Sequence, residues 1–412
     1  MHRSILVLSI LTATGCATAD PRAITDVTPA MMPLVRGSNA FAWGSYAALD
    51  AMGTSGNLFY SPFSIVAAFS MVYGGAEGNT ASQLEDAFGI EDESAWHRNM
   101  GLLLEDLTGE HHRPYTLHTA NRIWAQAGFP FETPFLDLTA ETYGASLAEA
   151  DFVAEAEAVR EEINAWVADQ TRDRIPELLP EGSVSGDTIM VLANAIYFLA
   201  DWATQFDADD TWDQSFTRAA GGTVQVPFMH AVTEFGYAED ASVQILEMPY
   251  ETGDLSMYVI LPQDGVDLEG IADLLTVEQV DAWIADLSVC EVDVAFPSFQ
   301  MDWTLPLVDT LLEMGVTDAF DPGLADFTDI ADPVEGNIFI QTAVHKAFVR
   351  VDEKGTEAAA ATGIVMDLES AEPERPIFEA DHPFVYFIRD NLTTSILFLG
   401  RMEDPSEAPL ED

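Results

Sequence analysis

The sequence predicts an α+β protein built on large antiparallel or mixed β-sheets. Segments with helical periodicity come first along the chain, and segments with strand-like composition and hairpin-like spacing follow them. With 412 residues, of which 48% are hydrophobic, the chain is long enough to bury a large core. General disorder is therefore excluded.

The expected elements follow from local patterns in chain order. Helices are predicted to include residues 39–43 and 65–73, and a third amphipathic helix is predicted around 164–167. Apolar, β-branched and aromatic runs bounded by turn residues then predict strands at 188–198, 244–250, 255–261, 292–296, 338–351 and 384–388.

A single domain is predicted from residue 37 to 405, because no Pro/Gly-rich linker or low-complexity block divides the chain after about Ser38. Residues 1–15 are expected to be a signal peptide, 16–36 a tether containing three prolines, and 406–412 an acidic tail.

The charge of the chain excludes several classes of partner. Asp and Glu number 70 against 16 Lys and Arg, which gives a formal net charge of -54. Binding of nucleic acid, of heparin-type polyanions or of anionic lipid through basic patches is therefore not expected. Such an acidic surface suits a salty environment, because salt screens its self-repulsion.

The N-terminus indicates export. An apolar stretch from Ile5 to Leu11 leads to Ala13-Thr14-Gly15-Cys16, which resembles a bacterial lipobox with alanine in place of the commoner leucine. Lipidation of Cys16 would anchor the protein to the bacterial cell envelope, at the outer membrane or cell surface; without it the protein would be secreted. Lipidation would also leave Cys290 without a partner, as a small buried side chain on a strand.

The motifs of common enzymes are absent from the sequence. It contains no Gly-x-Ser-x-Gly elbow, phosphate-binding loop, dinucleotide fingerprint or Cys-x-x-Cys pair. Glu110-His111-His112 lacks the spacing of metal ligands on one helical face, and His230, His345 and His382 are scattered. We expect no enzymatic activity, no cofactor and no metal.

Local patterns allow two structures for residues 353–370, EKGTEAAAATGIVMDLES. Four alanines between Thr356 and Gly363 are typical of a short capped helix. The segment has no apolar stripe with which a helix could dock, however, and it follows a predicted strand. Local patterns leave both structures open.

Motifs in a fixed order along the chain resemble those of the serpins. The segments that carry this resemblance include NLFYSPFSI at 57–65, GGAEGNT at 74–80, VLANAIYF at 191–198 with Trp202 and Phe206, VPFM at 226–229, MPY at 248–250, LADF at 324–327, VHKA at 344–347 and DHPF at 381–384. The resemblance spans nearly all of residues 37–404. It implies the serpin fold, with helices packed on three β-sheets and an exposed reactive-centre loop.

The resemblance implies an irreversible, suicide-substrate inhibitor of serine proteases. In this family a protease cleaves the loop, and the cleaved loop inserts into the central sheet while the protease is held as an acyl-enzyme. The hinge of the loop would consist of Glu353, Gly355, Thr356, Glu357, Ala358, Ala359, Ala360, Ala361 and Thr362. Because strand side chains alternate, Thr356, Ala358, Ala360 and Thr362 would face the core, and Glu357, Ala359 and Ala361 would face outward.

The family pattern also predicts the bond that a protease would cut. The seventeenth residue counted from the hinge glutamate is Glu369, so the expected bond joins Glu369 and Ser370. The alternative register places the cut after Leu368. The first would suit a Glu-accepting or permissive elastase-like protease, and the second an elastase-, chymotrypsin- or subtilisin-like protease.

Further positions carried over from the family are a polar shutter cluster of Ser61, Ser64, Asn194 and His345, and Trp202 in the breach at the top of the sheet. Ser298 stands where many relatives have a lysine that pairs with the hinge glutamate, so the partner of Glu353 is undetermined. The expected partner molecule is a target serine protease that binds a monomer. The alternative function is a non-inhibitory serpin that acts as a binding or chaperone protein.

Overall fold

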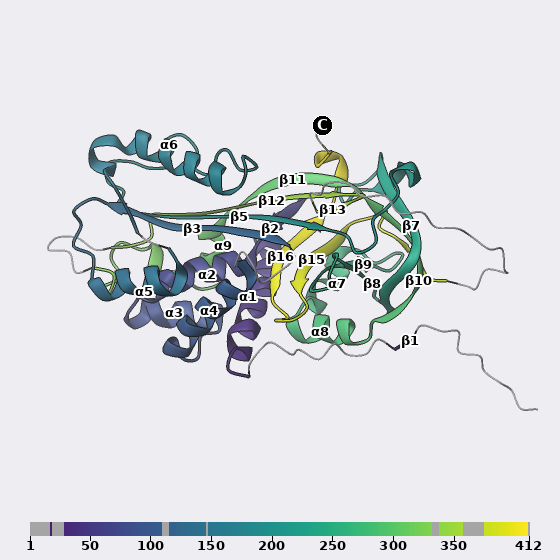
Figure 1. The fold of residues 1–412 in the computed structure, drawn as a ribbon, viewed down its shortest axis with the longest axis horizontal. Coiled ribbons are helices and arrows are strands. Elements are labelled where there is room, and N and C mark those ends of the chain that lie inside the picture. The colour runs from purple at the N-terminus through teal and green to yellow at the C-terminus, as the bar shows by residue number, and fades with distance from the viewer. Residues whose placement is uncertain are drawn as a thin grey trace, which may run out of the picture.

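The strands form two continuous sheets, one of six strands and one of ten. The computed structural model describes residues 29–108, 115–145, 147–331, 338–356 and 375–410, together with the backbone of 17–18. Figure 1 shows the long six-stranded sheet reaching across the molecule and the ten-stranded sheet curling into a barrel-like half at one end.

The six-stranded sheet contains the strand pair on which the site depends. Its order is β11 (Phe299–Leu305), β12 (Thr342–Asp352), β13 (Gly355–Thr356), β5 (Met190–Asp201), β3 (Thr116–Gln126) and β4 (Ala148–Ala150). β12 and β5 also pair directly, in parallel, where residues 342–347 lie beside 191–196. The short β13 lies between the same two strands further along.

The ten-stranded sheet is continuous because β7 is long enough to belong to two parts of it. The first half of the sheet comprises β1 (Ala17–Thr18), β10 (Ser288–Pro297), β14 (Ile377–Glu379), β6 (Thr211–Thr217) and β7 (Thr223–Glu239). The second half comprises β8 (Val243–Pro249), β9 (Leu255–Pro262), β15 (Phe384–Asp390), β16 (Ile396–Met402) and β2 (Leu58–Tyr60). Two of the three expected sheets are thus joined through β7 and β8.

The helices cover both faces of the six-stranded sheet. Figure 1 shows α6 on one face and α2 to α5 on the other. The α-helices are α1 (Met32–Ala51), α2 (Pro62–Tyr73), α3 (Gly78–Phe88), α4 (Glu93–Thr108), α5 (Thr133–Tyr143), α6 (Phe152–Gln170), α7 (Leu268–Ile271), α8 (Val277–Ala285) and α9 (Leu307–Glu313). Single 3-10 turns are η1 (Ala208–Asp210), η2 (Ala272–Leu274), η3 (Asp318–Phe320) and η4 (Pro405–Glu407).

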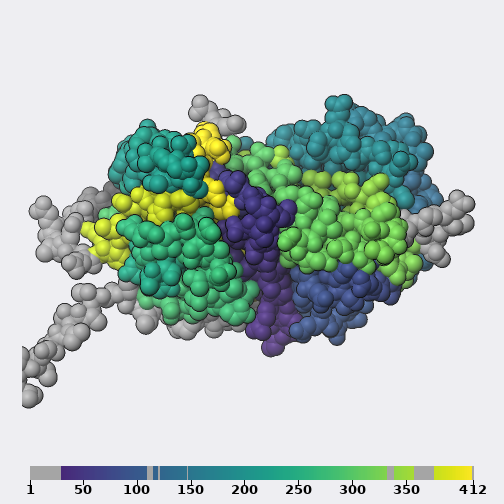
Figure 2. All heavy atoms as spheres, turned by 180° about the vertical axis from the view of Figure 1, so that it is seen from behind, coloured from purple at the N-terminus to yellow at the C-terminus, as the bar shows by residue number. Residues whose placement is uncertain are grey.

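The position of α2 explains its sequence. All of its residues, PFSIVAAFSMVY, are buried, because the helix lies between the six-stranded sheet and the surrounding helices. Ser61 caps the helix by accepting a hydrogen bond from the backbone N–H of Ser64. In the space-filling view from behind, α1 appears as a purple band between the two halves of the molecule (Figure 2).

The α+β class is confirmed, and every predicted helix and strand has the predicted type. The largest differences in strand boundaries are at β12, which begins at Thr342 instead of residue 338, and at β10, which begins at Ser288 instead of residue 292. β7, which has 17 residues, was not predicted as one strand, since its inward and outward residues do not alternate regularly. None of the described helices is long and apolar enough to cross a membrane.

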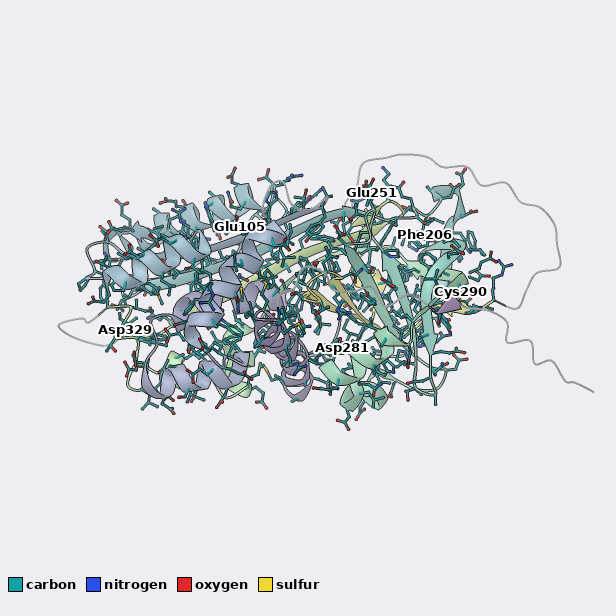
Figure 3. The ribbon with its side chains drawn as sticks, turned by 60° about the horizontal axis from the view of Figure 1, so that its bottom comes forward. Glu105, Phe206, Glu251, Asp281, Cys290 and Asp329 are labelled. Carbon is teal, nitrogen blue, oxygen red and sulfur yellow. The ribbon has the colours of Figure 1, made fainter. Side chains whose placement is uncertain are left out.

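Cys290 differs from the expected buried thiol. It lies on β10 as predicted, but it is half-buried and takes part in a disulfide. Figure 3 shows it on the ribbon near β1. The other cysteine in the sequence, Cys16, lies outside the described residues; lipidation of its thiol, which would exclude a disulfide with Cys290, stays a prediction, as does export.

Candidate functional site

The chain turns back into the six-stranded sheet directly after β12. It leaves β12 at Asp352, turns at Glu353 and Lys354, and returns as β13 between β12 and β5. Thr356 pairs with Val351 on one side and with Ala200 on the other, and both pairings are antiparallel. The two residues of β13, Gly355 and Thr356, are therefore strand, whereas the helix alternative would begin at Glu357, outside the described residues, and stays untested.

Gly355 is required by close contact with the neighbouring backbone. A Cβ atom at this position would lie 2.2 Å from the carbonyl oxygen of Ala200 and 2.7 Å from the Cα of Asp201. Neither atom can move without displacing β5. Gly355 therefore has a steric role, since glycine alone lets the two backbones approach this closely.

Thr356 faces the core, as the alternation of strand side chains predicts. It is 1% exposed, and its hydroxyl lies 2.9 Å from the hydroxyl of Tyr250. The ring of Tyr250 stacks on Trp202, with 4.6 Å between the ring centroids. Tyr250 therefore links the inserted hinge residue to the aromatic side chain expected in the breach.

Trp202, which directly follows β5, binds the turn between β12 and β13. Its indole N–H donates a 2.9 Å hydrogen bond to the carbonyl of Asp352, and its backbone N–H donates a 2.8 Å bond to the carbonyl of Lys354. The indole is 3% exposed, so these hydrogen bonds are protected from water. Trp202 thereby fixes the top of β5 to the start of the hinge.

The side chain of Glu353 is held by Thr211, a residue that the family pattern did not suggest as its partner. The hydroxyl of Thr211 donates a 2.8 Å hydrogen bond to its carboxylate, and the backbone N–H of Phe206 donates a 2.8 Å bond to its carbonyl. Ser298 does not take this role; its backbone N–H binds the carbonyl of Pro227. Figure 3 shows Phe206 and Glu251 at this end of the molecule.

Acidic side chains gather around the turn. Partial burial raises the pKa of Asp201, and the nearby carboxylates of Glu251 and Asp352 raise it further, whereas Lys354 lowers it. Asp352 is also paired with Arg350, with 3.1 Å between carboxylate oxygen and guanidinium nitrogen. The hinge therefore leaves β12 at a place where neighbouring carboxylates repel one another.

The four predicted shutter residues lie together, at the level where β5 and β12 pair directly. The backbone N–H of Ser61 donates a 3.0 Å hydrogen bond to Nε2 of His345, and Nδ1 of His345 bonds to the side-chain oxygen of Asn194. The Asn194 amide then donates to the hydroxyl of Ser64 at 2.8 Å. The cluster connects α2 to both strands.

The directions of these bonds define the state of His345. Nε2 accepts from a backbone N–H, so the ring proton is on Nδ1 and points to Asn194. Complete burial lowers the pKa of His345 to about 3, and the ring is therefore neutral at neutral pH. His345 and Asn194 are register partners of β12 and β5, so their hydrogen bond spans the strand pair.

Asn121 is a member of the cluster that the sequence reasoning missed. It lies beside Asn194 in the β3–β5 pairing, and its side-chain oxygen accepts from the Asn194 amide. Asparagine is disfavoured inside a strand, but the sequence predicted no strand at residues 116–126, so this signal could not be used. Thr211 offered no comparable signal.

Several predicted positions lie outside the described residues. They are Glu357, Ala358, Ala359, Ala360, Ala361, Thr362, Leu368, Glu369 and Ser370. Within the described ranges, no three His, Cys, Asp or Glu side chains are grouped so that they could hold a metal ion.

Comparison with known proteins identifies the family. The model of the serpins, described as serine protease inhibitors, matches residues 36–405. The chain belongs to the serpin family. Human leukocyte elastase inhibitor is 38% identical over 383 residues, which cover 91% of this chain and 100% of that protein.

Other relatives come from distant organisms. This serpin is 36% identical to leukocyte elastase inhibitor from Xenopus laevis over 89% of the chain and 97% of the relative, and 37% identical to an uncharacterized serpin-like protein of Thermococcus kodakarensis over 91% and 86%.

Solved structures share the fold. Native tengpin, a thermophilic serpin, matches with a TM-score of 0.82 and 26% identity, covering 90% of this chain and 94% of its own. Uncleaved ovalbumin matches with a TM-score of 0.80 and 28% identity, covering 90% and 100%. The serpin fold expected from the sequence is confirmed.

The contact at Gly355 predicts that Gly355→Ala displaces β13 from the sheet, because the new methyl group overlaps the Ala200 carbonyl. Losing a few ladder hydrogen bonds, each worth about 1 kcal/mol, should raise amide exchange at residues 355–356 and 200–202 by on the order of a hundredfold. Gly44→Ala is the control, since its Cβ would meet only the flexible end of Met314. Unchanged exchange in Gly355→Ala would contradict the steric role.

Burial of neutral His345 predicts a loss of stability in acid. Because its folded pKa of about 3 is below the ordinary value of 6.5, the contribution is complete above pH 6.5 and declines as the pH falls toward 3. The decline is about 1.4 kcal/mol per pH unit for this one group. Unfolding free energies of wild type and His345→Gln should converge below pH 6.5; a pH-independent difference would show that His345 does not titrate in this way.

Proposed function

We propose that this serpin is an irreversible suicide-substrate inhibitor of serine proteases that accept Glu369, or alternatively Leu368, in a bait loop. The observation that supports this function best is the position of β13. Gly355 and Thr356 already lie between β5 and β12, antiparallel to both, in the place that an inserting loop would occupy. Insertion would extend a strand that has already begun.

The observed register of β13 fixes which residues of β5 and β12 each inserted residue would pair with. Thr356 lies beside Ala200 and Val351, so continuing the strand takes Ala360 to Ile196 and Ala347, and Thr362 to Asn194 and His345. These residues are at present paired across the β5–β12 contact. Insertion through Thr362 therefore has to break the hydrogen bond between Asn194 and His345.

The position between β5 and β12 that the loop would enter favours small side chains on both faces of the sheet. On one face, the side chains of Ile196 and Phe198 belong to the main core; on the other, those of Ala193 and Ala195 pack beneath α6. The residues that would pass under α6 include Ala361 and Gly363, and those facing the core include Ala358 and Ala360. The alanine-rich sequence fits a strand that is enclosed on both faces better than one with a solvent-exposed side.

The chemistry begins in the target protease. Its catalytic serine oxygen attacks the carbonyl carbon of Glu369, and the bond to Ser370 breaks as the Ser370 nitrogen takes up a proton. The bait then remains attached to the protease as an ester. Insertion of the freed loop must outpace hydrolysis of this ester by water, because hydrolysis would release active protease and a cleaved, spent inhibitor.

The free energy that drives insertion of the loop comes from strand pairing. About a dozen inserted residues that hydrogen-bond on both sides, at about 1 kcal/mol net for each bond, provide on the order of 10 kcal/mol. The uncleaved state is accordingly metastable, protected by the barrier to opening β5 and β12. Anchoring through a lipid on Cys16 would place this reaction at the cell envelope of a bacterium.

Incubation with elastase-like and Glu-specific serine proteases should give a complex that survives SDS, together with a released peptide that begins at Ser370. Gel electrophoresis and N-terminal sequencing measure both. A peptide beginning at Glu369 would select the alternative register. If each protease only cleaves the loop and stays active, the inhibitory function is wrong for these targets and the non-inhibitory alternative is favoured.

Thr356→Arg should convert the inhibitor into a substrate. A guanidinium would have to enter a site in which Thr356 is 1% exposed, and burying an unpaired charge is strongly unfavourable. We expect the number of inhibitor molecules consumed per protease to rise at least about tenfold. Thr356→Ser, which keeps the hydroxyl near Tyr250, is the control; unchanged stoichiometry for Thr356→Arg would argue against insertion.

A further inference from the structure

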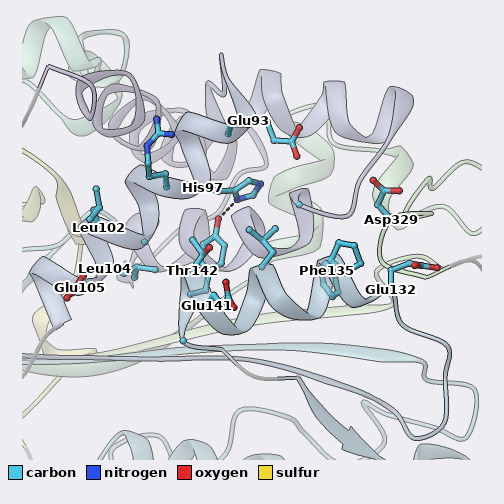
Figure 4. A pocket seen from close by; sticks show the side chains of 18 of the residues that line it. Glu93, His97, Leu102, Leu104, Glu105, Glu132, Phe135, Glu141, Thr142 and Asp329 are labelled. Carbon is cyan, nitrogen blue, oxygen red and sulfur yellow. Dashed lines mark hydrogen bonds between the residues drawn. The ribbon is translucent and has the colours of Figure 1, made fainter.

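Three large apolar side chains are exposed on neighbouring strands of the ten-stranded sheet. They are Trp212 on β6, Val232 on β7 and Ile377 on β14, which are 51%, 48% and 57% exposed. Other exposed apolar residues lie elsewhere, such as Leu102 on the lining of the acidic pocket between α4 and α5 that Figure 4 shows. A single exposed apolar side chain is ordinary, whereas a contiguous group of them is typical of a contact surface.

The pairing of the strands places two of these side chains on either side of one carboxylate. Val232 and Ile377 are both register partners of Asp293, so the three residues form a row across β7, β10 and β14. Val292 and Val294, the neighbours of Asp293 along β10, are buried in the core. Because side chains alternate along a strand, the row faces outward. Adjacent strands lie about 4.8 Å apart, which makes the row about 10 Å wide.

Trp212 extends the row at the end nearer to β6. Its ring stacks on His230, with 3.5 Å between the ring centroids, and His230 lies two residues before Val232 and therefore on the same face of β7. The two ring nitrogens of His230 hydrogen-bond to the Asp210 carbonyl and to the side-chain oxygen of Gln214, which fixes the stack. We refer to five residues as the β10 patch: Trp212, His230, Val232, Asp293 and Ile377.

The carboxylate of Asp293 has no cation beside it among the described residues. Glu291, two residues earlier on the same face, accepts a 2.8 Å hydrogen bond from the guanidinium of Arg375. The Asp293 carboxylate forms neither an ion pair nor a hydrogen bond with any residue that the structure describes. It is half-buried between two apolar side chains, where a charge is screened less than on an open surface. A cation on an apolar stem would match both features.

The β10 patch lies within reach of a protease that cuts the bait loop. The backbone N–H of Asp293 donates a 2.9 Å hydrogen bond to the carbonyl of Pro376, so the downstream arm of the loop returns to the sheet at the patch. Ile377 follows Ser370 by seven residues, which span at most about 25 Å. A protease domain of about 200 residues is about 40 Å across. A protease that holds the bond before Ser370 is therefore large enough to contact the patch.

We propose that the β10 patch is a second contact surface for the target protease, and that it binds an arginine or lysine side chain beside the protease active site. The methylene groups of that side chain pack between Val232 and Ile377, and its charged end pairs with Asp293. This inference rests on the proposed function, because the bait loop brings the protease to the patch. Insertion moves the protease away, so the contact speeds recognition and cleavage and leaves the outcome after cleavage unchanged.

The second-order rate constant for cleavage of the loop in the full chain tests the patch, since gel electrophoresis measures it whether the protease is trapped or released. The probes are elastase-like and Glu-specific serine proteases. With the protease that cleaves the wild type fastest, Asp293→Asn should lower the rate constant about tenfold, because it removes one charged pair, and Val232→Ser should lower it about threefold. The number of inhibitor molecules consumed per trapped protease should not change.

Glu161→Gln and Val153→Ser are the matched controls. Each removes an exposed side chain of the same kind from α6, which lies at the other end of the molecule from β10 (Figure 1), and neither should change the rate constant. If the patch variants slow cleavage no more than these controls, the proposal is wrong, even when a complex that survives SDS supports inhibition.

The opposite failure gives a different result. If Asp293→Asn and Val232→Ser slow cleavage but the protease stays active, the contact surface is confirmed and the inhibitory function is wrong. If light scattering shows a wild-type dimer that Val232→Ser dissociates, a second copy of the chain occupies the patch and the proposal is overturned. If none of the proteases cleaves the loop, both proposals are wrong.

Discussion

The proposed insertion depends on a strand contact that must hold before cleavage and part after it. β5 and β12 pair directly over only six residues each, 191–196 with 342–347, and the hydrogen bond between Asn194 and His345 joins them in that stretch. Further along, β13 has already separated the same two strands. The sheet is thus closed at one end and open at the other, with Ser61 and Ser64 of the α2 N-terminus holding the closed end.

This contact accounts for the polar residues in the core. A network of neutral hydrogen bonds is satisfied when the strands are paired, but it can be broken without exposing a charge. A neutral His345 suits that role, since a protonated ring could not accept from Ser61. At the open end, contact between backbones requires Gly355, and aromatic packing of Trp202 with Tyr250 supports Thr356. The acidic surface contributes repulsion around the turn, where Asp201, Glu251 and Asp352 lie close together.

Local sequence patterns were sufficient for the class of fold and for the type of each predicted element, because burial imposes periodicity on them. The shutter residues could be located only through family resemblance, since Ser61, Asn194 and His345 are far apart along the chain. Asn121 and Thr211 were missed because their roles arise from pairing between strands and from the approach of β6 to the hinge.

The central claim is that the bait loop continues β13 between β5 and β12. A crystal structure of the chain after cleavage in the loop tests it most directly. Our account predicts that residues 356–362 form a strand antiparallel to both neighbours, with Thr362 between Asn194 and His345. A cleaved structure in which Asn194 and His345 still bond across a closed β5–β12 pair would contradict it.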